Sequence, residues 1–151
     1  MAGNGWSSHE LGGRAAQVLD PWNRWLAGFD PLAATVRSRW HEGTSWIDDW
    51  DPANPARGQC GSSSLVLQDE CGGYLARGEV HETGRSAVPA LHYWNLVRDR
   101  HVDFTWQQFS PAAFVLRWEL VDRHDLLVGS WFTDRYRALR ARVDEHFLAP
   151  A

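Results

Sequence analysis

The sequence predicts an α+β fold in which helices come first, a small antiparallel sheet follows and further helices end the chain. Asp-Pro pairs at positions 20–21 and 30–31 place proline directly after an N-cap residue, which predicts helices near 21–28 and 31–41. Segments 74–80, 91–97 and 101–106 are rich in the aromatic and β-branched residues of strands. Further helix starts at Ser110-Pro111, before 112–121, and at Thr133 complete the order.

Length and composition indicate one globular domain. The chain has 151 residues, of which 44% are hydrophobic and 23% charged, and this suffices for a single core. We expect a flexible N-terminus over residues 1–17, which is rich in Gly and Ser, and one domain over 18–151. The formal net charge is −4 and the basic residues are scattered, so we expect no nucleic-acid partner. No apolar run reaches the length of a membrane span and no signal-peptide pattern opens the chain, so we expect no membrane partner and a cytoplasmic location.

Cys60 is the candidate nucleophile. A loop of structure-breaking residues precedes it, and an apolar stretch that ends in Gly72-Gly73 follows it, so a helix should begin at this cysteine. The unsatisfied N–H groups and the dipole of a helix N-terminus stabilise a thiolate. The alternative for an isolated cysteine is a buried structural role. We expect that role for Cys71, at the other end of the same helix.

A histidine and an aspartate on adjoining strands complete a candidate triad. Alternation along the strand puts His92 and Trp94 on one face. If Asn95 pairs with Arg100 across a four-residue loop, Asp103 lies opposite His92. The carboxylate would then orient the imidazole and leave its other nitrogen for the thiolate. Taken alone, such a pair is more often structural than catalytic.

Residues near the candidate triad suggest how a substrate would be held. Gln59 directly precedes the nucleophile, so its side-chain amide and the backbone N–H of Cys60 are candidate oxyanion donors. The alternative is that Gln59 only braces the loop. The candidate substrate-binding residues are Trp46, Trp50, Trp94 and Asn95. Core packing is the alternative role for each of these tryptophans.

A string of short motifs runs through residues 30–110. They are Gly58-Gln59-Cys60, then Leu65-Val66-Leu67-Gln68-Asp69 with Gly72-Gly73, then His92-Tyr93-Trp94-Asn95, and finally Val102-Asp103-Phe104-Thr105 with Gln108-Phe109. This string resembles the bacterial YunG-like family. The Cys, His, Asp order of that family is similar to the transglutaminase-like and arylamine N-acetyltransferase-like branch of the papain fold. The resemblance therefore implies a papain-like core, in which the helix that bears the nucleophile packs on the sheet, and it places the triad on Cys60, His92 and Asp103.

The predicted function is acyl transfer by a hydrolase or an acyltransferase, without a cofactor. Cys60 attacks an amide, thioester or ester carbonyl, His92 transfers the proton and Asp103 orients His92. The expected substrate is a small molecule or a short peptide, in specialised metabolism, and the histidines show no metal-ligand spacing. Two alternatives stay open. The same site could perform a non-hydrolytic addition or cyclisation, or the protein could be a non-catalytic binding module with a tryptophan-lined pocket.

Overall fold

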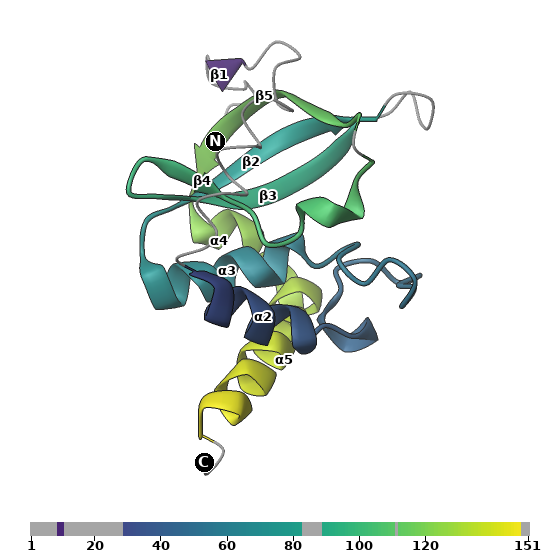
Figure 1. Ribbon diagram of the computed structural model, residues 1–151, viewed down its shortest axis with the longest axis vertical. Helices are drawn as coiled ribbons and strands as arrows, with labels where there is room; N and C mark the ends of the chain where they lie inside the picture. Colours follow the sequence, from purple (N-terminus) through teal and green to yellow (C-terminus); the bar gives the residue numbers. More distant parts are fainter. Residues whose placement is uncertain (1–8, 11–28, 83–88, 111, 149–151) are drawn as a thin grey trace.

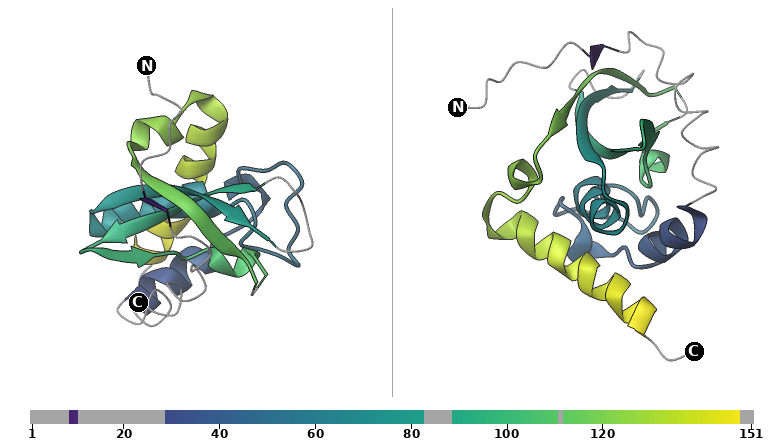
Figure 2. Two further views of the ribbon diagram at one scale, coloured as in Figure 1. Left: turned by 90° about the horizontal axis from the view of Figure 1, so that it is seen from above. Right: turned by 90° about the vertical axis from the view of Figure 1, so that its left-hand side faces the viewer.

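A computed structural model of the protein describes residues 9–10, 29–82, 89–110 and 112–148 and has an α+β architecture (Figure 1). An antiparallel sheet has the strand order β1-β5-β2-β3-β4. Its strands are β1 (His9–Glu10), β2 (Tyr74–His81), β3 (Ala90–Val97), β4 (Arg100–Val102) and β5 (Phe114–Val121). The helices are α2 (Asp30–Ser38), α3 (Cys60–Cys71), α4 (Arg123–Leu126) and α5 (Gly129–Leu148). Helices α2, α3 and α5 lie together on one side of the sheet (Figures 1 and 2).

Helix α3 lies at the centre of the domain. It packs against β2 and β3 on one side and against α5 on the other. As predicted, it begins at Cys60, and it ends before Gly72, whose φ of 70° is a left-handed conformation that favours glycine. The seven residues after Cys60, from 61 to 67, are all buried. This helix therefore fixes its first turn firmly between the sheet and α5.

Two of the three clusters of buried side chains in the described residues lie on opposite faces of the sheet, since Trp94 and Val97 alternate along β3. The cluster on the helix side is formed by α2, α3, α5 and the β3–β4 hairpin, and it contains Ala33, Val36, Trp40, Ala56, Val66, Leu67, Val97, Val102, Phe104, Leu139 and Val143. The cluster on the other face contains Ala76, Val80, Trp94, Ala113, Val115 and Trp118. The sheet is thus covered on both faces where β3 passes between the clusters.

Residues 112–121 were predicted as a helix, and the structure shows that this prediction is wrong because residues 114–121 form β5. This strand pairs with β2, and the register shifts between Gly78 and Val80 so that β5 accommodates one extra residue. The bulge lets Val115 and Trp118 both enter the same buried cluster. Pairing with β2 and burial in this cluster therefore outweigh a local helix-start signal.

The other predicted elements are found with changed bounds. Strands β2 and β3 confirm the segments predicted at 74–80 and 91–97, and α2 confirms the helix near 31–41. The third predicted strand, 101–106, is shortened to β4. The last helix begins at Gly129, so Thr133 is not its cap.

The N-terminal predictions are mostly outside the described residues. These are the helix near 21–28 and most of the segment 1–17. Within that segment the structure describes His9–Glu10, which pair with β5. No helix in the described ranges is both long and apolar enough to cross a membrane.

Candidate active site

Cys60 occupies the first turn of α3. The first intrahelical hydrogen bond runs from the Ser63 N–H to the Gln59 carbonyl at 3.0 Å. The backbone N–H groups of residues 60–62 therefore have no partner within the helix. They point toward the space in front of the helix, where the dipole favours negative charge. The Cys60 side chain is partly exposed, so a ligand can reach it.

The β3–β4 hairpin turns over Arg98 and Asp99, which have φ values of 51° and 62°. Two central residues with positive φ make the kind of tight turn that suits the twist of antiparallel strands. The predicted four-residue loop, with Asn95 paired to Arg100, is therefore wrong, since Asn95 pairs with Val102. Arginine is not a usual residue for this conformation, so the residue types at this position do not signal the turn.

The register error leaves the expected faces unchanged. The true pairing differs from the predicted one by two residues, and side chains alternate with a period of two. His92 and Asp103 therefore still share a face of the sheet. Asp103 lies directly after the end of β4, where the chain leaves the sheet.

His92 and Asp103 form a buried pair. The Nε2 atom of His92 lies 2.5 Å from Oδ2 of Asp103, and the two residues are 0% and 4% exposed. The other carboxylate oxygen, Oδ1, accepts hydrogen bonds from the Thr105 backbone N–H at 2.9 Å and from the Thr105 hydroxyl at 3.1 Å. Asp103 is therefore held from both sides, and its contact with Nε2 fixes the orientation of the imidazole.

Aromatic rings enclose the His92 imidazole. Trp94 stacks on it with ring centroids 5.7 Å apart, and Phe109 meets it edge-on at 4.9 Å. Burial disfavours the charged ring, but the charge of Asp103 and its hydrogen bond, with smaller contributions from Cys60, raise the pKa of His92 to about 10. Its Nδ1 atom is buried and makes no well-formed hydrogen bond within the described residues. The Cys60 contribution to this pKa places the thiol close to the ring.

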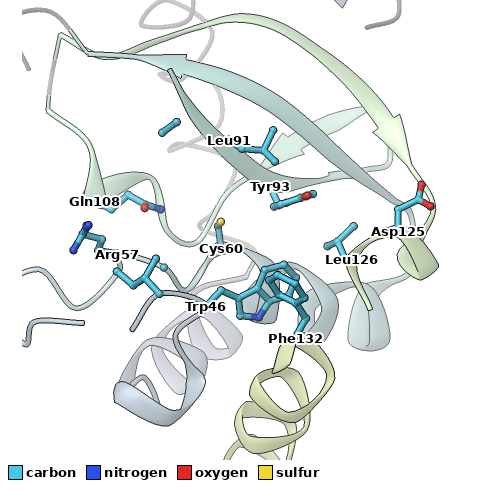
Figure 3. Close-up of a pocket in the computed structure, with 12 residues that line it drawn as sticks. Trp46, Arg57, Cys60, Leu91, Tyr93, Gln108, Asp125, Leu126 and Phe132 are labelled. Atoms are coloured by element: carbon cyan, nitrogen blue, oxygen red, sulfur yellow. The ribbon is translucent and has the colours of Figure 1, made fainter. Parts of the chain in front are cut away.

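Cys60 opens into a pocket of about 390 Å³, which is shown in Figure 3. The pocket is lined by Trp46, Ile47, Arg57, Gly58, Cys60, Ala90, Leu91, Tyr93, Gln108, Asp125, Leu126 and Phe132. Most of these side chains are apolar, and the volume lies in the range of small-molecule sites. Cys60 is the nucleophilic side chain on this wall, so a ligand in the pocket can meet the sulfur.

The four predicted substrate-binding residues have different positions in the structure. Trp46 lies on the pocket wall, and its indole N–H donates to the Ser62 hydroxyl at 2.7 Å. Trp50 is outside this wall, with its indole bonded to the Pro55 carbonyl at 3.0 Å. The structure also places the last two residues away from the pocket, since both are buried. Trp94 donates to His101 Nδ1, and Asn95 donates to the Ser64 carbonyl.

The side chain of Gln59 braces the loop before α3 and does not face the pocket. It is fully buried, its Nε2 donates to the His41 carbonyl at 3.0 Å, and its Oε1 accepts from the Thr44 hydroxyl at 2.8 Å. Both ends of the amide are thus occupied, which corrects the expectation that the side chain donates to an oxyanion. The backbone N–H of Cys60 remains a candidate donor.

Several pocket residues had not been predicted. Tyr93 had a usable signal, because strand alternation puts it on the face opposite His92, toward the nucleophile helix. Phe132 lies on α5 and meets Trp46 with ring centroids 4.6 Å apart. No local pattern identifies Phe132, because only the packing of α5 brings it to the pocket. Across the described ranges, no group of three or more His, Cys, Asp or Glu side chains is placed to hold a metal ion.

Comparison with known proteins gives the family. The family model described as YunG protein matches residues 29–148 of this chain. The Uncharacterized protein YunG of Bacillus subtilis (strain 168) is 32% identical over 70 residues, which are 46% of this chain and 51% of that protein. The alignment thus covers about half the length of this curated relative, and no solved structure matches the chain. The family match spans most of the chain and includes all three triad candidates, and the protein therefore belongs to the YunG family.

Proposed function

We propose that this protein is a cysteine-dependent acyl-transfer enzyme with a papain-like or transglutaminase-like core. The observation that carries the proposal is the buried His92–Asp103 pair, whose ring also interacts with the Cys60 thiol at the start of a helix. A pocket of about 390 Å³ in front of Cys60 suits a small molecule or a short peptide. The cytoplasmic location expected from the sequence is part of the same proposal.

The first half of the reaction would transfer an acyl group to Cys60. The Cys60 sulfur, as a thiolate, attacks the carbonyl carbon and forms a C–S bond, while the carbonyl oxygen takes the electron pair. The free N–H groups at the start of α3 are positioned to stabilise that oxygen. When the intermediate collapses, the bond to the leaving nitrogen, oxygen or sulfur breaks, and the His92 imidazolium supplies the proton that this atom needs.

The second half would release the acyl group. Water or an amine attacks the thioester, His92 takes the proton of the attacking group, and the C–S bond breaks to restore the thiolate. Asp103 keeps the ring in place throughout through its contact with Nε2. The mostly apolar lining of the pocket suits an amine with an apolar body better than water as the acyl acceptor.

The two rival functions differ in their support. A non-hydrolytic addition or cyclisation would use the same nucleophile and base, and the geometry of the site suits it equally. The hypothesis of a non-catalytic binding module requires a pocket that is lined by several tryptophans. Of the three that were expected, Trp46 alone lies on this wall. The binding module is therefore less well supported than an enzyme.

Capture of an acyl-enzyme tests the proposal. The protein is mixed with p-nitrophenyl acetate, and the acetyl group is located by intact mass and peptide mapping. All 15 basic residues counted as Lys or Arg are arginines, so lysine acetylation does not interfere. We expect one acetyl group on Cys60 in the wild type and in Cys71→Ala, and none in Cys60→Ala. A protein that carries no acetyl group on Cys60 at any time point contradicts acyl transfer.

A further inference from the structure

Gln108 connects the pocket wall to the candidate triad. It ends a short 3-10 helix, Trp106–Gln108, and it lines the same pocket as Cys60 (Figure 3). Its Nε2 atom lies 3.1 Å from the Thr105 carbonyl oxygen and 3.3 Å from the Thr105 hydroxyl oxygen. The same hydroxyl donates to Oδ1 of Asp103. A chain of hydrogen bonds therefore runs from the pocket through Thr105 to the carboxylate that holds His92.

This chain fixes which way the Gln108 amide points. The Thr105 carbonyl can only accept hydrogen bonds, and the Thr105 hydroxyl gives its single proton to Asp103. The NH₂ end of the amide must therefore face Thr105. The other end, Oε1, is turned away from these partners, and among the residues that the structure describes none donates to it. The pocket wall thus carries an oriented, unfilled hydrogen-bond acceptor.

The other polar side chains on the pocket wall are less suited to hold a substrate in one orientation. Arg57 is about half exposed and forms an ion pair with Asp49 at 3.2 Å. Asp125 is exposed on α4 (Figure 3). Neither has a hydrogen-bonded connection to His92 and Asp103 in the described part of the chain. Gln108 is therefore the polar wall residue that the fold holds in one orientation.

We propose that Gln108 is a substrate-positioning residue whose Oε1 accepts a hydrogen bond from an N–H group beside the carbonyl that Cys60 attacks. This inference rests on the proposed acyl-transfer function and narrows its substrate class. The site would prefer amides that carry an N–H, or amine acceptors, to esters with the same acyl group. An ester leaves the acceptor unpaired in a mostly apolar pocket, and sites built around a hydrogen bond discriminate against ligands that lack it.

A pair of alkylating agents tests this preference without a known substrate. Iodoacetamide carries an N–H group and methyl iodoacetate does not, while both present the same reactive carbon. In each case the Cys60 thiolate forms the S–C bond, the C–I bond breaks and iodide leaves, while His92 keeps the proton that the thiol gave up when the thiolate formed. The quantity measured is the ratio of the two rate constants at Cys60, obtained by peptide mapping.

Three variants distinguish a substrate-positioning role of Gln108 from a purely structural role in supporting Thr105. Gln108→Met keeps the length of the side chain but removes the acceptor, and we expect the amide-to-ester ratio to fall about threefold to tenfold. Gln108→Glu keeps acceptor oxygens but loses the NH₂ group that bonds Thr105, so the ratio should fall less than it does in Gln108→Met. Gln107→Met changes the exposed neighbour and should leave the ratio unaltered. The ratio at Cys71 provides an internal reference in every sample.

Three other results would each contradict a different part of the proposal. If Gln108→Met slows both reagents equally, or slows neither, Gln108 merely supports Thr105 and the positioning role is wrong. If Gln108→Glu keeps the full wild-type ratio, the hydrogen bonds to Thr105 do not orient the acceptor, and the positioning argument built on them is wrong. If wild-type Cys60 reacts no faster than Cys71 with either reagent, the proposed function fails, and the inference fails with it.

Discussion

Helix α3 carries a cysteine at each end, and the two thiols have opposite surroundings. Cys60 is the first residue of the helix, faces a pocket and interacts with His92. Cys71 is the last residue and packs against the core cluster that α2 and α5 share. Burial, followed by the charge of Glu70, raises the pKa of Cys71, and Arg98 offsets this only in part.

The comparison shows that position on a helix decides what a thiol can do. The N-terminal end presents free N–H groups to Cys60, whereas the C-terminal end presents carbonyl oxygens to Cys71. The neighbouring residues follow the same division. Gly61 and three serines come after Cys60, and Asp69 and Glu70 come before Cys71. Cys71 is therefore a control for Cys60 within the same molecule.

The largest expected effect comes from removing the charge at Asp103. Asp103→Asn preserves the shape of the side chain but removes the carboxylate that keeps His92 protonated. Alkylation of Cys60 by iodoacetamide at about pH 6 should slow roughly 100-fold, and alkylation of Cys71 should not change. Asp99→Asn, in the exposed turn of the same hairpin, is the matched control. Equal rates of Cys60 alkylation in Asp103→Asn and the wild type would show that Asp103 does not affect the reactivity of this thiol.

The next effect is on stability. The folded-state pKa of His92 is about 10, above the ordinary histidine value near 6.5. Between these values the folded protein binds more protons than the unfolded chain. The contribution of His92 to the free energy of unfolding is therefore complete below about pH 6.5. It is lost as the pH rises toward 10, and the free energy of unfolding falls by up to about 1 kcal/mol per pH unit.

Urea unfolding at several pH values across this range measures the slope. Cys60→Ala is the background for the experiment, because it removes the titration of that thiol. We expect the free energy of unfolding to decline as pH rises in Cys60→Ala, and to decline less in the Cys60→Ala, Asp103→Asn double variant. A stability that stays constant or increases from pH 6.5 to 10 in the first variant would refute the raised pKa of His92.

The tight contact between Gly61, in the first turn of α3, and Trp46 predicts a smaller effect on stability and on Cys60 reactivity. A Cβ atom at Gly61 would lie 2.5 Å from carbons of the Trp46 indole, which forms part of the pocket wall. Although alanine has the better helix propensity, Gly61→Ala should destabilise the protein by about 1 to 2 kcal/mol and slow alkylation of Cys60. Trp46→Phe reduces the ring, so Gly61→Ala should cost less in that background. Costs that simply add in the double variant would argue against this contact.

The smallest predicted effect concerns the Cys71 end. Arg140 on α5 lies 2.7 Å from Glu70 and 3.5 Å from Asp69, and thereby ties α5 to the end of α3. Arg140→Ala should lower the free energy of unfolding by about 1 kcal/mol and leave Cys60 alkylation unchanged. Arg137→Ala, an exposed neighbour on α5, serves as the control. A strong loss of Cys60 reactivity in Arg140→Ala would show that the two ends of α3 are coupled.

The sequence predicts those parts of the site that depend on local pattern. Structure-breaking residues before Cys60 and glycines after Cys71 locate the helix correctly. The period of two along a strand puts His92 and Asp103 on one face, even though the expected register was wrong by two residues. Alternation identifies a face but does not say what covers it. Trp94 was therefore expected at the pocket, although it is buried in a core cluster.

Features that depend on tertiary contacts could not be predicted. Residues 114–121, within the predicted helix, form a strand because β2 is available to pair with them, despite a helix-start signal before them. Phe132 reaches the pocket because α5 packs beside Trp46. The Gln108 amide is oriented by Thr105 and Asp103. These contacts are made in the loop after β4, and the conformation of that loop has no local sequence signal.

The pH dependence of alkylation at the two cysteines of the wild-type protein tests the central claim most directly. Iodoacetamide is added across a range from about pH 5 to 9, and both thiols are followed by peptide mapping in the same sample. We predict that at about pH 6 Cys60 reacts roughly 100-fold faster than Cys71. Equal rates at every pH, or labelling of Cys60 only after the protein unfolds, would contradict a thiolate paired with His92 and exclude nucleophilic catalysis by Cys60.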